Sequence, residues 1–185
     1  MLIFLDTEFT ELKQTAKLIS IGLVDETGTR TFYAELSDTY VLADCSPFAQ
    51  ETVLPLLEGG AALMTLQEAG ERLSAWIADL PGDECASFVS DSVGWDWPFV
   101  YDIFHAHGTW PDRLNRDPVP IHPTVAYPAF EHACERAYRD GLREHHALDD
   151  ARANRAGWVV ASSTEQFQRD DVEWGLSGSD ALHPR

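Results

Sequence analysis

The first ten residues constrain the fold of this chain more than any other stretch, because Met1 to Thr10 combine a large apolar run with two acids. Four large apolar residues lead directly into Asp6-Thr7-Glu8, a pattern typical of a buried central strand that ends in carboxylates. Side chains alternate between the faces of a strand, so Asp6 and Glu8 point the same way. Two neighbouring carboxylates repel each other unless a cation lies between them. The stretch therefore indicates an oxygen-rich site for a divalent metal.

Charge excludes one large class of ligand. The chain of 185 residues carries 31 acids and 13 bases, a formal net charge of -18. A groove that holds long duplex DNA needs the opposite balance. Divalent cations can still bring a phosphodiester to an acidic site, because they cancel several negative charges locally.

The length predicts one domain, residues 1–161, followed by a C-terminal extension, 162–185, that is partly packed through residues 172–176 or flexible. No apolar run is long enough to cross a bilayer, and the start lacks the basic region of an export signal. We expect a soluble cytoplasmic protein without membrane contact. Three widely spaced cysteines indicate neither a disulfide framework nor a zinc site.

Hydrophobic periodicity predicts strands first and then helices alternating with short strands. The predicted strands cover residues 1–10, 17–25, 30–36, 84–90 and 119–121. The predicted helices cover 65–80, with Thr65 and Glu68 as a capping box, a segment starting at Trp97-Pro98, then 129–141 and a last helix ending near Ala161. An antiparallel meander of three strands that continues into parallel strands flanked by helices is an α/β fold.

Acids and histidines far apart in the chain complete a constellation. Asp96 follows a strand, and Asp150 lies on the last helix shortly after His145 and His146. Together with Asp6 and Glu8, these are the groups that a two-metal phosphodiesterase requires. Carboxylates hold two divalent ions about 4 Å apart, and a histidine takes the proton of the attacking water.

These residues resemble the three motifs of the DEDDh 3′-to-5′ exonucleases of the ribonuclease H-like superfamily. Asp6-Thr7-Glu8 matches the first motif, Trp95-Asp96 the second, and the spacing from His145 to Asp150 the third. The residues Asp-Thr-Glu-Phe, the small size and the strand Ile-Ser-Ile-Gly-Leu-Val are most similar to the small bacterial exoribonucleases of the mycobacterial type. The resemblance implies a ribonuclease H-like mixed sheet and release of nucleoside monophosphates from a 3′ end of single-stranded nucleic acid, most simply RNA.

The resemblance also implies roles for individual residues. Asp6 bridges two Mg²⁺ or Mn²⁺ ions, Glu8 and Asp150 complete their coordination, and Asp96 holds the second ion. His145 is the implied general base.

The implied substrate contacts fall on Thr7, Phe9 and Trp95. Trp97 and Leu12 are further candidates for contact with the bases. Phe9 stands where many relatives have threonine, so a contact made by that hydroxyl is missing here. Relatives commonly form homodimers.

Several of the candidate site residues have a neighbouring residue of the same type as an alternative. Helical geometry favours His146, which shares a face with Asp150, whereas the family spacing favours His145. We select His145 and expect the other histidine to be at the surface. Asp91 competes with Asp96, and we expect Asp149 to be an exposed acid of the first helical turn.

The type of nucleic acid also stays open. A 3′-5′ exonuclease of single-stranded DNA, or a binding module without hydrolysis, is an alternative to the exoribonuclease. Arg139, Arg143 and Arg152 flank the third motif and could form a local basic patch.

Overall fold

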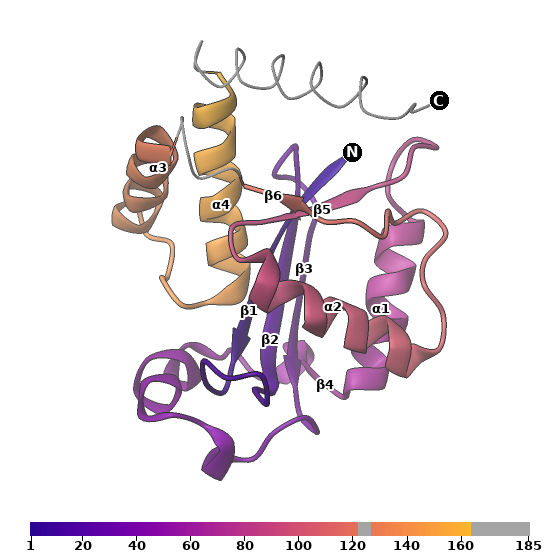
Figure 1. The fold of residues 1–185 in the computed structure, drawn as a ribbon, viewed down its shortest axis with the longest axis vertical. Helices are drawn as coiled ribbons and strands as arrows, with labels where there is room; N and C mark the ends of the chain where they lie inside the picture. The colour runs from indigo at the N-terminus through magenta and orange to yellow at the C-terminus, as the bar shows by residue number, and fades with distance from the viewer. Residues whose placement is uncertain (122–126, 164–185) are drawn as a thin grey trace, which may run out of the picture.

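A computed structural model describes residues 1–121 and 127–163 and shows a six-stranded sheet with helices on both faces (Figure 1). The strand order is β4-β3-β2-β1-β5-β6. β1 pairs antiparallel with β2, and β2 antiparallel with β3, whereas β5 is parallel to β1 and β6 to β5. The strands are β1 Leu2–Phe9, β2 Leu18–Asp25, β3 Thr31–Leu36, β4 Leu63–Met64, β5 Ser87–Ser90 and β6 Val119–Pro120. The predicted mixed sheet is confirmed, and the predicted extension 162–185 lies almost entirely outside the described residues.

Helices cover both faces of the sheet. α1 (Leu66–Ala78) and α2 (Val93–His107) lie on one side, and α4 (Ala147–Ser162) lies on the other, with α3 (Tyr127–Arg139) packed outside it (Figure 1). The predicted capping box begins α1, where Glu68 N donates to Thr65 Oγ1 and Thr65 N to Glu68 Oε2. Four short turns, η1 to η4, lie between β3 and β4 (Leu42–Asp44, Ala49–Val53, Leu54–Leu56 and Gly60–Ala62). No described helix is long and apolar enough to span a membrane.

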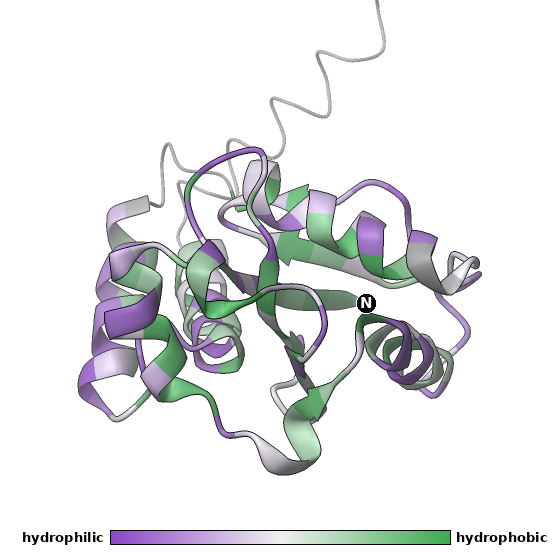
Figure 2. Ribbon diagram, turned by 90° about the horizontal axis from the view of Figure 1, so that it is seen from below, coloured by the Kyte–Doolittle hydropathy of each residue, from purple (hydrophilic) through white to green (hydrophobic). Residues whose placement is uncertain are grey.

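Apolar side chains of β1 alternate between two hydrophobic cores, and this alternation determines which face of the sheet its carboxylates lie on. Ile3 and Leu5 are fully buried in the cluster that includes α1 and α2, whereas Phe4 packs toward α4 in a second cluster. The green strands in the middle of Figure 2 lie between these helical layers. By the same alternation, Asp6 and Glu8 face α4. The pairing of β1 with β2 becomes irregular between Glu8 and Phe9, so the strand ends with a local bend at the site.

Gly22 lets the start of α4 touch the sheet beside Asp6. The two residues are direct partners across β1 and β2. A Cβ at position 22 would lie 2.2 Å from the backbone nitrogen of Leu148 and 2.3 Å from the carbonyl carbon of Ala147. Only glycine allows two backbones to approach this closely. The first turn of α4 is therefore held directly over the acidic end of β1.

The predicted start of the second helix at Trp97-Pro98 is wrong. α2 begins at Val93, and Pro98 lies inside it. A proline in the second turn removes only the bond that its nitrogen would have donated to Gly94, in the exposed first turn. The earlier start brings Asp96 into the first turn, where the helix dipole favours a carboxylate.

Candidate active site

A cleft of about 910 Å³ opens where the end of β1 meets the starts of α2 and α4. All five predicted catalytic residues line it: Asp6, Glu8, Asp96, His145 and Asp150. They come from three distant segments, which the parallel pairing of β1 with β5 and the packing of α4 on Gly22 bring together. The roles assigned to these five residues stay predictions.

One group of three acids lies between β1, β5 and α2. Ligand oxygens of Asp6, Asp91 and Asp96 all lie within 4.8 Å of one another. Asp96 is buried and held on both sides, because Thr7 donates to its Oδ1 at 2.6 Å and Ser90 donates to its Oδ2. Two hydrogen bonds to one buried carboxylate fix its direction toward the cleft.

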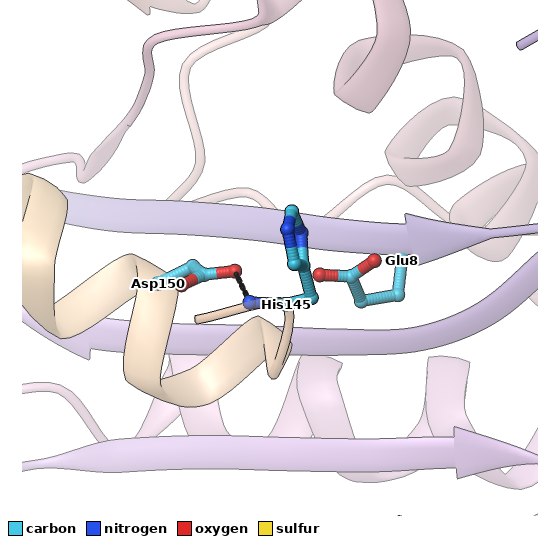
Figure 3. Close-up of side chains that lie close together, drawn as sticks. All are labelled: Glu8, His145 and Asp150. Carbon is cyan, nitrogen blue, oxygen red and sulfur yellow. Dashed lines mark hydrogen bonds between the residues drawn. The ribbon is translucent and has the colours of Figure 1, made fainter. Parts of the chain in front are cut away.

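A second group combines two acids with the predicted base. Ligand atoms of Glu8, His145 and Asp150 also lie within 4.8 Å of one another, and Figure 3 shows the His145 ring beside Glu8. The backbone nitrogen of His145 donates to Asp150 Oδ2 at 2.9 Å. Tyr138 donates to Asp150 Oδ1 at 2.8 Å, so both oxygens of Asp150 are hydrogen-bonded.

Burial and mutual repulsion raise the pKa values of these acids. Burial, followed by the charges of Asp96, Asp150 and Glu8, holds the pKa of Asp6 well above its usual range. Burial and then the charge of Asp150 raise the pKa of Glu8 to about 8. Burial raises the pKa values of Asp96 and Asp150 to about 7, against the hydrogen bonds that they accept. Such acids ionise together only when positive charge is supplied.

The donor set fits divalent cations. Carboxylate oxygens are the ligands that suit Mg²⁺ and Mn²⁺, whereas the thiolates of a structural zinc site are absent from the described lining of the cleft. Lys13 is the one lysine or arginine of that lining, and its Nζ lies 2.5 Å from Glu11 Oε2. The acids of β1 therefore have no protein cation to pair with in the described part of the cleft.

Comparisons with known proteins agree with this geometry. The sequence profile of the family described as "3′-5′ exoribonuclease Rv2179c-like domain" matches residues 1–161. The chain belongs to this exonuclease family. Membership confirms the predicted class of enzyme, a 3′-5′ exonuclease. No curated protein sequence matches significantly.

Two solved structures resemble this exonuclease in fold. One is Pop2p of S. pombe in its Mg²⁺ and Mn²⁺ bound form, with a TM-score of 0.53 and 15% identity over 89% of this chain and 83% of that one. The other is the nuclease domain of 3′hExo, a DEDDh family member, bound to rAMP, with a TM-score of 0.53 and 16% identity over 89% of this chain and 94% of that one. Likeness at this identity establishes the fold, and the predicted ribonuclease H-like architecture is confirmed.

His145, and not His146, faces the cleft of the exonuclease. His145 has a φ of 66°, which is rare for a residue other than glycine and turns the chain just before α4. The ring of Phe48 meets the imidazole edge-on, with centroids 4.9 Å apart. Strain of this kind persists only when the surrounding contacts enforce it, and it occurs often in active sites.

The expectation that His146 lies at the surface is wrong. His146 is 1% exposed and is the N-cap of α4, where its Nδ1 accepts from Asp149 N at 3.4 Å. Burial, followed by the charge of Arg143, lowers its pKa, so the ring is neutral at neutral pH and Nδ1 can accept. Its ring lies against Tyr33, with centroids 4.6 Å apart and the ring planes tilted by 30°, and it is not part of the described lining of the cleft. His146 does not share a helical face with Asp150, because a cap residue is not helical.

Asp149 is likewise buried, and the predicted exposure is wrong. Its Oδ2 accepts from Arg143 Nε at 2.6 Å and its Oδ1 from Arg152 Nη1 at 2.9 Å. Arg143 also binds Glu58 at 2.9 Å. These two arginines are therefore neutralised by carboxylates, and the predicted basic patch around the third motif is reduced to Arg139, for which no ion pair is seen among the described residues.

Aromatic side chains form one wall of the cleft. Phe9 stacks on Trp95 with centroids 5.7 Å apart and on Phe99 with centroids 5.5 Å apart. Trp95 is 38% exposed and Leu12 is 74% exposed at the rim. Trp97 instead packs against Phe88 and Trp110 in the core, away from the described lining.

Asp91 and Asn154 are among the polar residues of the cleft that were not predicted as part of the site. Asp91 follows β5 directly and accepts from Asn154 Nδ2 of α4 at 3.0 Å. The available signal was its position: carboxyl ends of neighbouring parallel strands meet at one edge of a sheet. Asn154 has no sequence motif, and lies one helical turn beyond Asp150 on the same face of α4.

Proposed function

We propose that this enzyme is a metal-dependent 3′-5′ exoribonuclease that releases nucleoside monophosphates from the 3′ end of single-stranded RNA. The observation that carries this proposal is the convergence of Asp6, Glu8, Asp96 and Asp150 with His145 in one cleft, with the pKa values of the acids raised. Buried acids that repel one another are costly unless they bind cations. The proposed ions are two Mg²⁺ or Mn²⁺.

The proposed residues have two kinds of role: some bind the metal ions, and one transfers a proton. Asp6 and Asp96, with Asp91 beside them, form one proposed ligand group, and Glu8 and Asp150 form the other. When bound, the two ions stabilise the attacking and leaving oxygens of the phosphodiester. A ring nitrogen of His145 accepts the proton of the attacking water, whose oxygen bonds to phosphorus while the bond from phosphorus to the 3′ oxygen breaks. The 3′ oxygen then takes a proton from solvent, His145 releases its proton to solvent, and a nucleoside 5′-monophosphate leaves.

RNA is supported over DNA by two of the comparisons. The matching family is described as exoribonuclease, and the similar 3′hExo domain was solved with rAMP. The ring of Trp95, which is 38% exposed and stacks on Phe9, offers a surface for the terminal base, because base stacking on aromatic rings tolerates any sequence. Thr7 is buried and its hydroxyl is bonded to Asp96, so its predicted contact with substrate stays a prediction.

The test compares 5′-labelled single-stranded RNA and DNA with Mg²⁺, Mn²⁺ or a chelator, and with the 3′ hydroxyl free or blocked. We expect a ladder that shortens from a free 3′ end of RNA only when metal is present. Asp6→Asn and Asp96→Asn keep the shape of each side chain but remove its charge, and should abolish release. Asp102→Asn, which changes an exposed acid of the same helix α2, is the matched control and should keep full activity.

Nucleotide release by Asp6→Asn that is undiminished and independent of metal contradicts the proposal. Cuts at internal positions of the substrate indicate an endonuclease instead. A homodimer and a cytoplasmic location stay predictions. Light scattering of the purified chain tests the first, and cell fractionation tests the second.

A further inference from the structure

The surface around the cleft lacks the positive charge that long nucleic acids need. Seven carboxylate residues and one lysine line the described cleft, and that lysine is paired with Glu11. Two divalent ions bring four positive charges, fewer than the six net negative charges of this lining. Proteins that bind single strands of any sequence instead use a positively charged groove along the backbone. Phosphates that lie away from the ions therefore meet a negative surface.

The groove that continues the cleft is also acidic. A hollow of about 430 Å³ between α3 and α4 shares Asp91, Tyr138, Glu144 and Asn154 with the cleft. It adds Glu131 and Glu135, and Arg139 is its one cation among the described residues. A strand leaving the cleft along α3 thus passes four acids and one base.

We propose, on the basis of the function proposed above, that this enzyme acts preferentially on oligoribonucleotides of about two to three nucleotides and disfavours long single strands. Pockets of roughly 300–1,000 Å³ each hold one drug-sized ligand, so the cleft of about 910 Å³ encloses only a short piece of a strand. Binding comes from metal ions at the scissile phosphate and from the ring of Trp95, which stacks on Phe9. Neither contribution grows when the strand is longer than the cleft.

The proposal predicts an unusual response to salt. Proteins that hold many phosphates with lysine and arginine lose affinity steeply between about 50 mM and 200 mM salt. Here added salt screens the repulsion between distal phosphates and the acids of the groove, because the Debye length falls to about 10 Å at 0.1 M. Salt should therefore improve cleavage of long substrates relative to short ones.

The experiment measures kcat/KM on unstructured RNAs of two, three, five, ten and about twenty nucleotides at a fixed concentration of Mn²⁺. We expect a maximum at two to three nucleotides and a decrease of about tenfold at twenty in low salt, because several like charges lie within a Debye length. The decrease should shrink at about 200 mM salt. A kcat/KM that rises with length and falls with salt overturns the proposal. Release from no RNA of any length overturns the proposed function itself and the length preference with it.

Charge variants locate the effect. Glu131→Gln combined with Glu135→Gln removes two charges from the groove and should raise kcat/KM for the twenty-nucleotide RNA by about threefold while leaving the dinucleotide unchanged. Asp83→Asn combined with Glu84→Gln changes the net charge by the same amount as the groove pair. These two residues lie in an exposed loop before β5, at the end of β5 opposite to Asp91 and the cleft. This control should change neither rate. Equal effects of the two pairs overturn the role of the groove.

Discussion

Gly22→Ala should damage catalysis more than it damages the fold. The new Cβ would lie 2.2 to 2.3 Å from three backbone atoms of Ala147 and Leu148, whereas carbon atoms in contact prefer about 3.5 to 4.0 Å. Backbone atoms of a helix start are unable to rotate away as a side chain can. The first turn of α4 must therefore retreat from β2 by roughly 1.2 Å or more.

The displaced turn holds His145 and Asp150, so both move relative to Glu8 on the fixed strand β1. A shift of about 1 Å in catalytic geometry costs about a hundredfold in rate. Overpacking of this kind costs about 1–3 kcal/mol of the free energy of unfolding. For a domain of this size each kcal/mol lowers Tm by about 2–4 °C, so the variant stays folded at room temperature.

The assay measures kcat and KM on a trinucleotide together with Tm. Gly157→Ala is the matched control on the same helix: its Cβ would lie 2.4 Å from Phe130 Cδ2 and 2.9 Å from Cys134 Sγ. Those atoms belong to side chains at the contact with α3, about 15 Å along the helix axis from Ala147. We expect a comparable loss of Tm with kcat within about threefold of the original. A Gly22→Ala enzyme with unchanged kcat refutes the reasoning that this close contact sets the site.

Three further variants or conditions test separate parts of the site. His145→Asn keeps a side chain that tolerates a positive φ but removes the proposed base. Nucleotide release should fall by about 10²- to 10⁴-fold with unchanged Tm. Retained activity contradicts the assignment of His145 as the base. Phe48→Ala removes the ring that contacts His145 and should lower kcat several-fold, whereas Phe48→Tyr keeps the ring and should keep kcat. Equal losses of kcat in the two variants argue against positioning of His145 by the ring. In chelator, Tm should fall as pH rises from about 5 to 8. The folded protein keeps Glu8 protonated up to its pKa of about 8, whereas the unfolded chain releases this proton near pH 4.5. Saturating Mn²⁺ should abolish that fall, and a flat profile in chelator contradicts the proposed repulsion.

The sequence predicts the part of this site that depends on local pattern. The apolar run before Asp6 identifies a central strand, and a period of two places Glu8 on the same face, with no knowledge of the rest of the chain. The choice of Asp96 and Asp150 required the family motif, because nothing local distinguishes them from other acids. The structure brings all four to one cleft.

The remaining features depend on contacts that no local pattern contains. His145 has its positive φ in the turn that joins α3 to α4, and it lines the cleft, whereas helical geometry alone favoured His146. Asp149 is buried because Arg143 and Arg152 reach it, and Glu58, which holds Arg143, is 85 residues away in the chain. Helix α2 begins before its proline because Asp96 is secured by Ser90 and Thr7 of the neighbouring strands. Tertiary contacts thus override local preference mainly beside the site.

The apolar core selects the strand register on which the site depends. A slip of one residue between β1 and β2 would move Ile3 and Leu5 out of the core shared with α1 and α2. It would also remove Gly22 from its place opposite Asp6, so that a bulky neighbour met the backbone of α4. Burying the apolar residues of β1 therefore forces its two carboxylates toward Asp150, although the carboxylates themselves oppose the arrangement. Folding energy from the core holds the acids together, and cation binding is the step that can recover part of that cost.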